Sequence, residues 1–143
     1  MLLETERRFI ASRPVGHLAT ASAAGIPHAV PVCFAVTESA AYITIDAKPK
    51  RGRPTRLKRV RNIQENPVAS LVVDRYSDDW SQLGWVMLHG PAEILPEGEE
   101  HDQAQALLRA RYPQLASMQI AHLPVIAIRI ARTSSWGNLT STV

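Results

Sequence analysis

The feature that most restricts the fold of this chain is a succession of short apolar runs, each closed by residues that favour turns. Runs of this kind, bounded by Gly, Pro, Asn or Asp, are typical of β-strands. Most of them are joined by short turns rather than by regularly alternating helices, which favours antiparallel pairing over parallel α/β winding. The sequence therefore predicts a mainly β fold, a small antiparallel barrel. Its six expected strands are 15–21, 28–36, 41–46, 68–74, 84–95 and 124–131.

Three further segments have the pattern of short helices that flank this barrel. Residues 2–12 repeat apolar side chains at helical spacing, and residues 55–65 place an apolar side chain at every third position. Residues 97–111 begin with acidic and end with basic side chains, which suits the helix dipole. A chain of 143 residues has the length of one domain, so residues 1–143 are expected to share a single core.

Prolines and glycines make two of the predicted strands unusual. Pro27 and Pro31 lie in or beside the second run, and proline cannot donate a hydrogen bond to a neighbouring strand. That run is therefore expected at a sheet edge, at a bulge or against a ligand. Gly90-Pro91 is expected to break the fifth run. The first three runs, joined by two short turns, are expected to form an antiparallel meander.

Positive charge is concentrated in residues 48–61, which hold eight of the 16 Lys and Arg residues and no acidic residue. The rest of the chain has 8 basic against 13 acidic residues, so the pI near 9.4 is a local property. Like charges at this density repel one another and cost stability unless an anion binds. A loop that leads into a helix also offers backbone N–H groups to such an anion. Arg56 and Arg59 share one helical face, from which both can bind one phosphate. The alternative is a solvated helix face without a ligand.

The remaining residues argue against several classes of site. The chain has no glycine-rich dinucleotide or P-loop pattern and no Cys/His spacing of a metal site. Its five histidines are scattered, and no catalytic triad follows from spacing. We therefore expect no catalytic side chain and no metal, and we expect any chemistry to come from a cofactor.

The cysteine content and the hydropathy of the chain indicate the cellular compartment to expect. The single cysteine, Cys33, lies in an apolar run and is expected to be buried, which favours a cytoplasmic protein. No apolar run is long enough to cross a bilayer, and the first residues do not resemble a secretory signal, so we expect no membrane partner.

Several motifs in a fixed order resemble one family. Residues 25–32 read GIPHAVPV, residues 41–48 read AYITIDAK, and residues 56–67 carry Arg-x-x-Arg-x-x-Asn-Ile-x-x-Asn-Pro before VASLVVD. The loop DRYSDDW at 74–80 and the strand end HGPA at 89–92 extend the match. Together they resemble the flavin-binding split β-barrels related to pyridoxamine 5′-phosphate oxidase, over nearly the whole chain. Within that group the chain most resembles the branch that uses the deazaflavin coenzyme F-420 in place of FMN.

The resemblance implies a six-stranded split barrel that forms a homodimer, with two cofactor sites at the subunit interface. It places the flavin-like ring along Pro31 and Val32 and the cofactor phosphate at the basic loop and helix start. Arg59 stands where the family usually has a lysine, and Trp80 matches an aromatic residue that reaches the ring from the partner subunit. The positions that the resemblance assigns to cofactor binding are Pro31, Val32, Lys48, Lys50, Arg56, Arg59 and Trp80.

The implied function is that of an F-420-dependent oxidoreductase, which transfers a hydride between the deazaflavin and a small unsaturated substrate. The surplus of cations suits the phosphate and oligoglutamate tail of F-420 better than it suits FMN. The alternatives are an FMN-dependent oxidoreductase, a non-catalytic protein that binds flavin or deazaflavin, and a binder of single-stranded nucleic acid. The last class interleaves aromatic residues with its cations, and residues 48–61 contain none, so we expect no nucleic-acid partner. The residues that bind pyridoxal phosphate in the oxidase itself have no recognisable counterpart here.

Overall fold

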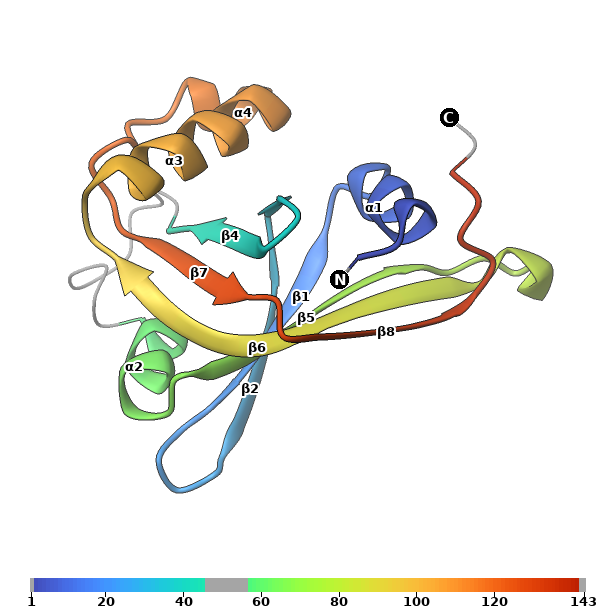
Figure 1. Cartoon of the computed structure of the whole chain (residues 1–143), viewed down its shortest axis with the longest axis horizontal. Helices are drawn as coiled ribbons and strands as arrows, with labels where there is room; N and C mark the ends of the chain where they lie inside the picture. The colour runs from blue at the N-terminus through green and yellow to red at the C-terminus, as the bar shows by residue number, and fades with distance from the viewer. Residues whose placement is uncertain (1, 46–56, 142–143) are drawn as a thin grey trace.

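The computed structural model describes residues 2–45 and 57–141 (Figure 1). Its helices are α1 (Glu4–Ala11), α2 (Lys58–Glu65), α3 (Glu99–Arg111) and the short α4 (Pro113–Ala116), with a 3-10 turn at Trp80–Gln82. Its strands are β1 (Gly16–Ala21), β2 (Pro27–Val32), β3 (Ala35–Val36), β4 (Ala40–Thr44), β5 (Val68–Arg75), β6 (Gly84–Leu95), β7 (Val125–Arg129) and β8 (Arg132–Gly137). None of the described helices is both long and apolar enough to span a membrane.

One antiparallel sheet of eight strands forms the frame of the molecule. The strands follow the order β2-β1-β5-β6-β7-β4-β3, and β8 pairs with the first half of β6. β6 belongs to both halves of the sheet, because residues 84–91 pair with β5 and residues 92–95 pair with β7. Figure 1 shows β6 curving from one half to the other. The predicted mainly β, antiparallel fold is confirmed, and the arrangement agrees with a split barrel.

The expected break at Gly90-Pro91 is wrong. The strand continues through both residues, which mark the point where β6 changes its partner from β5 to β7. A Cβ atom added to Gly90 would stand 1.8 Å from the carbonyl oxygen of Arg129 at the end of β7. Glycine stands here because two backbones touch, not because a turn interrupts the strand.

The number of strands also differs from the expectation. The run 28–36 divides into β2 and the short β3, and β8 is an additional strand. No apolar run marks β8, because its sequence is RTSSWG and most of its side chains are exposed. The first three runs do pair in sequence order as expected, but the second run does so in two parts: β2 pairs with β1, and β3 pairs with β4.

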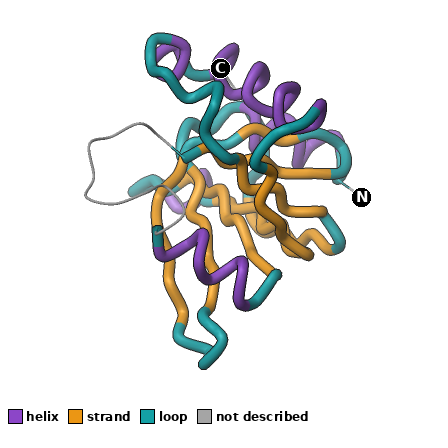
Figure 2. Tube along the Cα trace, turned by 90° about the vertical axis from the view of Figure 1, so that its left-hand side faces the viewer, coloured by secondary structure: helices purple, strands orange, loops and turns teal. Residues whose placement is uncertain are grey.

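Two apolar cores hold the helices on the sheet. In the first, α1 buries Phe9 and Ile10 and α2 buries Val60 and Ile63 against the inner strand faces. In the second, α3 and α4 cover the other face of β4 and β7, with Leu108 fully buried. This explains why every residue of β4 is buried. Figure 2 shows α3 and α4 at one end of the molecule and the β1–β2 hairpin at the other.

Hydrogen bonds to one carboxylate connect α3 to the strands of the second core. The hydroxyl of Tyr42 in β4 donates to Glu100 Oε2 at 2.6 Å, and Arg129 Nη2 in β7 donates to Glu100 Oε1 at 2.8 Å. The hydrogen bond from Arg129, followed by that from Tyr42, lowers the pKa of Glu100 to about 2. Burial, followed by the hydrogen bond to Glu100, raises the pKa of Tyr42 to about 12.

We expect this contact to make stability fall at both extremes of pH. The folded pKa of Glu100 lies below its ordinary value of 4.5, so its contribution is complete above pH 4.5 and is lost as the pH falls toward about 2. The pKa of Tyr42 is raised, so its contribution is complete below pH 10 and is lost as the pH rises toward about 12. Urea unfolding measured across pH should show both declines.

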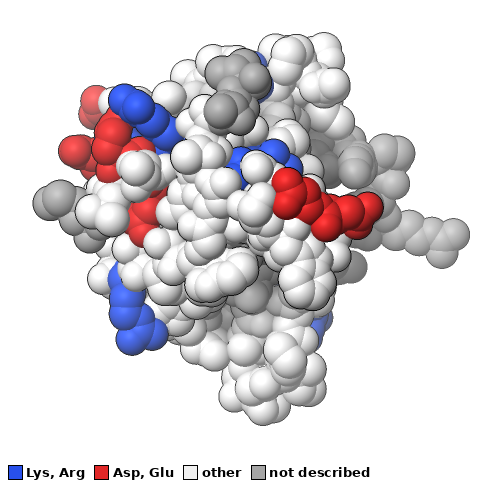
Figure 3. Space-filling model, turned by 90° about the vertical axis from the view of Figure 1, so that its right-hand side faces the viewer, with Lys and Arg blue, Asp and Glu red and all other residues white. Residues whose placement is uncertain are grey.

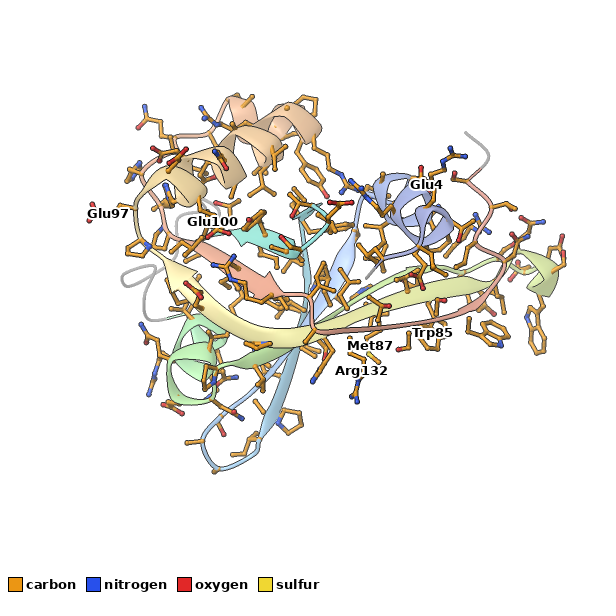
Figure 4. The ribbon with its side chains drawn as sticks, in the orientation of Figure 1. Glu4, Trp85, Met87, Glu97, Glu100 and Arg132 are labelled. Carbon is orange, nitrogen blue, oxygen red and sulfur yellow. The ribbon has the colours of Figure 1, made fainter. Side chains whose placement is uncertain are left out.

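Two variants distinguish the loss of stability at low pH that Glu100 causes from the general effect of removing a carboxylate. Glu100→Gln should flatten the decline of unfolding free energy below pH 4.5. Glu97→Gln, which removes an exposed carboxylate outside this contact (Figure 4), should leave the decline as it is in the wild type. If both variants show the same acid profile, Glu100 does not carry the effect.

Candidate functional site

A pocket of about 270 Å³ lies where the edge strand β2, the first turn of α2 and helix α4 meet. Pro31 and Val32 contribute from β2 and Arg59 contributes from α2, so three of the predicted cofactor-binding residues share one cavity. The described lining residues are Val15, Pro31, Val32, Cys33, Thr44, Arg59 and Leu115.

The edge position of β2 explains how Pro31 comes to line a cavity. β2 lies at one end of the sheet order and pairs with β1, where Pro31 stands opposite His17. Of the three positions expected from Pro27 and Pro31, a sheet edge, a bulge or a ligand contact, the structure shows the sheet edge. Proline has no backbone N–H, so at a sheet edge it leaves no unpaired donor there and presents an apolar ring instead.

The orientation of Arg59 follows from the way α2 is anchored. The helix begins at Lys58, so Arg59 lies in its first turn, and Asn62 one turn later is completely buried. The amide Nδ2 of Asn62 donates to Thr20 Oγ1 of β1 at 3.0 Å. A hydrogen bond of this kind contributes about 1 kcal/mol and fixes the rotation of the helix about its axis. The first turn of α2 is thereby held at the pocket.

The pocket combines an apolar wall with two polar groups. Its polar groups are the Thr44 hydroxyl, which accepts from Gln105 Nε2 at 3.0 Å, and the Arg59 guanidinium. A flat apolar ring fits against such a wall, and a guanidinium beside it can bind a phosphate or a carboxylate. Within residues 2–45 and 57–141, no three His, Cys, Asp or Glu side chains gather where they could hold a metal ion.

Sequence reasoning missed four of the lining residues: Val15, Cys33, Thr44 and Leu115. They come from separate segments, and only the folded chain brings them together. Cys33 directly follows one of the quoted motifs and Thr44 lies inside another, but no spacing rule marks either as a pocket residue. The expectation that Cys33 is buried is wrong, because its side chain is half-buried at the pocket.

Three predicted residues, Lys48, Lys50 and Arg56, lie outside the described residues. The described chain ends at Ile45 and resumes at Leu57, and residues close to both ends line the pocket, namely Thr44 and Arg59. Five of the eight basic residues of 48–61 lie between these two ends, so the chain enters and leaves this stretch next to the cavity.

Trp80 lies apart from this pocket, in the 3-10 turn that joins the far ends of β5 and β6 (Figure 1). Its side chain is 73% exposed. Asp79 shapes the turn by accepting from the backbone N–H of Ser81 at 3.1 Å. Much of the surface seen from this end carries no charge (Figure 3). One chain alone does not bring Trp80 to Pro31.

A second hollow of about 410 Å³ lies on the outer face of β5 and β6, lined by Val72, Asp74, Trp85 and Met87. Figure 4 shows Trp85 and Met87 beside Arg132 of β8, below the sheet and away from α1. Trp136, paired with Trp85 across β6 and β8, is 55% exposed. This face of the sheet therefore presents large apolar side chains.

Comparisons with known proteins agree with the fold. A family model described as pyridoxamine 5′-phosphate oxidase matches residues 2–137. A curated relative, the 5a,11a-dehydrotetracycline/5a,11a-dehydrooxytetracycline reductase of Streptomyces rimosus, is 30% identical over 135 residues. The match covers 94% of this chain and 82% of that reductase.

Solved structures share the architecture at lower identity. An F-420 reductase is 23% identical with a TM-score of 0.64, and the match covers 87% of this chain and 93% of that chain. The haem storage protein of Vibrio cholerae is 18% identical with a TM-score of 0.70, over 96% of this chain and 95% of that chain. These two likenesses concern the fold alone. Because the family model and the reductase both extend over nearly the whole sequence, the chain belongs to the pyridoxamine 5′-phosphate oxidase family and is related to oxidoreductases.

Proposed function

We propose that this protein is an F-420-dependent oxidoreductase, which transfers a hydride between the deazaflavin and a small unsaturated substrate. The observation that carries the proposal is the pocket in which Pro31 and Val32 meet Arg59, next to both ends of a strongly basic segment. A reductase among the curated relatives supports the reaction class, and an F-420 reductase of the same fold supports the cofactor.

The residues of the pocket fit the parts of such a cofactor. When bound, the deazaflavin supplies the hydride. Pro31 and Val32 would hold its ring along the apolar wall, and Arg59 would bind its phosphate through charge-assisted hydrogen bonds. The protein then acts by positioning ring and substrate in contact, which needs no side-chain acid or base.

The basic segment is expected to select F-420 over FMN by charge. F-420 has tail carboxylates in addition to the phosphate that both cofactors carry. Neutralising Lys50, Arg51 and Arg53 together should weaken F-420 binding and reduce its salt dependence, with little effect on FMN. Each exposed contact contributes less than about 1 kcal/mol, so the triple variant is the informative one. Affinities for both cofactors at low and high ionic strength test this; equal losses for F-420 and FMN would contradict it.

We also propose that the active form is a homodimer, in which Trp80 of each chain reaches the pocket of the other. The apolar outer face of β5, β6 and β8 is the surface that a second copy would cover, because large exposed apolar patches usually mark an interface.

Sedimentation at low micromolar concentration should therefore give twice the chain mass of 15.8 kDa. Met87→Arg, which places a charge on this face, should shift the protein toward the monomer and weaken cofactor binding. Leu107→Arg on α3, where Leu107 is 43% exposed, is the matched control and should stay dimeric. A monomeric wild type that binds cofactor fully would contradict both the dimer and the role of Trp80.

The reaction itself is tested by anaerobic mixing of the protein, reduced F-420 and a set of conjugated, unsaturated acceptors. Oxidation of F-420 that depends on both protein and acceptor is the expected result. Tight binding of F-420 without oxidation by any acceptor would favour the non-catalytic binding protein. Turnover with reduced FMN alone would favour the FMN-dependent oxidoreductase.

A further inference from the structure

Two of the residues that line the pocket are connected through one hydroxyl that lies outside it. The hydroxyl of Tyr112 accepts from the backbone N–H of Phe34 at 3.1 Å and donates to the carbonyl oxygen of Pro14 at 3.0 Å. Phe34 follows Cys33 and Pro14 precedes Val15, and both Cys33 and Val15 line the pocket. The Tyr112 side chain therefore fixes the distance between two segments of the pocket wall.

Tyr112 also positions a third residue of the pocket wall, Leu115. It stands directly before α4, and its carbonyl oxygen accepts from the backbone N–H of Leu115 at 2.9 Å. Leu115 reaches the pocket from this helix and is 5% exposed. Val15, Cys33 and Leu115 are far apart in sequence, and Tyr112 is hydrogen-bonded to the segment of each.

Arg111, the preceding residue, strengthens the same junction. Its guanidinium donates to the carbonyl oxygens of Phe34 and Ile10, each at 3.1 Å, and to that of Arg13. It also lies over the Phe34 ring, 4.3 Å from the ring centre. Burial is the main cause that raises the pKa of Tyr112, so its hydroxyl stays protonated and able to donate.

We propose that Tyr112 is a positioning residue that sets the shape of the wall formed by Val15, Cys33 and Leu115, and thereby the acceptor that the pocket takes. The inference rests on the proposed function, which assigns Pro31, Val32 and Arg59 to the cofactor. The rest of the described lining, Val15, Cys33, Thr44 and Leu115, carries no charged side chain, so it selects a mainly apolar acceptor by size and shape. Such walls discriminate about 10- to 200-fold per methylene group of substrate.

The decisive comparison is between Tyr112 and Tyr42, two tyrosines that belong to or pack against the second apolar core. Tyr112→Phe removes the hydroxyl that joins Pro14 to Phe34 and keeps the ring. Tyr42→Phe removes a hydroxyl that donates to Glu100 on α3, and Tyr42 is not among the described lining residues, so it controls for lost stability.

We expect Tyr112→Phe to raise the KM of an acceptor about three- to tenfold and to leave the Kd of F-420 within about twofold, because only the acceptor wall changes. Tyr42→Phe should leave KM and Kd as in the wild type. Equal KM changes in both variants, or a loss of F-420 affinity in Tyr112→Phe without a change in KM, would overturn the proposal.

A second readout does not depend on the cofactor. Cys33 is the single cysteine of the chain, so the rate of its alkylation by iodoacetamide reports on one point of the wall. Tyr112→Phe should change this rate by about threefold or more, and Tyr42→Phe should not, because only the former releases the Phe34 N–H beside Cys33. If the wild type binds neither F-420 nor FMN, the proposed function fails while this measurement still tests the positioning role. An unchanged rate in Tyr112→Phe overturns that role.

Discussion

Replacing Gly90 by alanine should lower the free energy of unfolding by more than about 4 kcal/mol, or prevent folding altogether. The added Cβ atom would stand 1.8 Å from the carbonyl oxygen of Arg129 and 3.0 Å from the backbone nitrogen of Ala131. Both are backbone atoms, which cannot move aside as the end of a flexible side chain can. β6 and β7 would have to separate where the two halves of the sheet join.

Gly25→Ala is the matched control for this change. Gly25 has a φ of +81°, and an added Cβ atom would meet nothing within 4 Å. Its replacement should cost only about 1 kcal/mol, the strain of a left-handed conformation. Urea unfolding followed by tryptophan fluorescence measures both variants. If Gly90→Ala is no less stable than Gly25→Ala, the close approach of β6 and β7 is wrong.

Replacing Arg59 by alanine should weaken F-420 binding about ten- to a hundredfold. A charge-assisted hydrogen bond contributes roughly 1.5–3 kcal/mol, and 1.4 kcal/mol corresponds to a tenfold change in affinity. Fluorescence titration of F-420 against the two proteins measures the loss.

Arg61→Ala removes the same charge from the same helix but from an exposed position outside the pocket lining. It should weaken binding by less than about threefold, through the general field of the basic segment alone. Equal losses in Arg59→Ala and Arg61→Ala would mean that charge, and not the position of Arg59 in the pocket, determines binding.

The fold could be predicted where local patterns coincide with tertiary structure. Alternating or continuous apolar runs mark strands that the core covers, and Pro27 with Pro31 marks the sheet edge. β8 could not be predicted, because most of its side chains are exposed and its sequence has no apolar run. It is held in place by backbone pairing with β6, which does not require apolar side chains. Gly90-Pro91 was misread because a close backbone approach and a turn both require glycine.

The site could be predicted only where it is built from motif residues. Pro31, Val32 and Arg59 belong to the motifs that resemble the family, and the fold brings them to one pocket. Val15 and Leu115 reach the same pocket from opposite ends of the chain. Their places depend on tertiary contacts such as those of Tyr112, which no spacing in the sequence encodes. Trp80 belongs to a motif but lies outside the pocket of its own chain.

The most direct test of the proposed cofactor site is a titration of the purified wild-type protein with F-420 and with FMN at low ionic strength. Absorbance and fluorescence changes give the affinity and the number of sites for each cofactor. The pocket beside the basic segment predicts one site per chain and a higher affinity for F-420 than for FMN. Tighter binding of FMN, or no binding of either cofactor, would contradict the proposal.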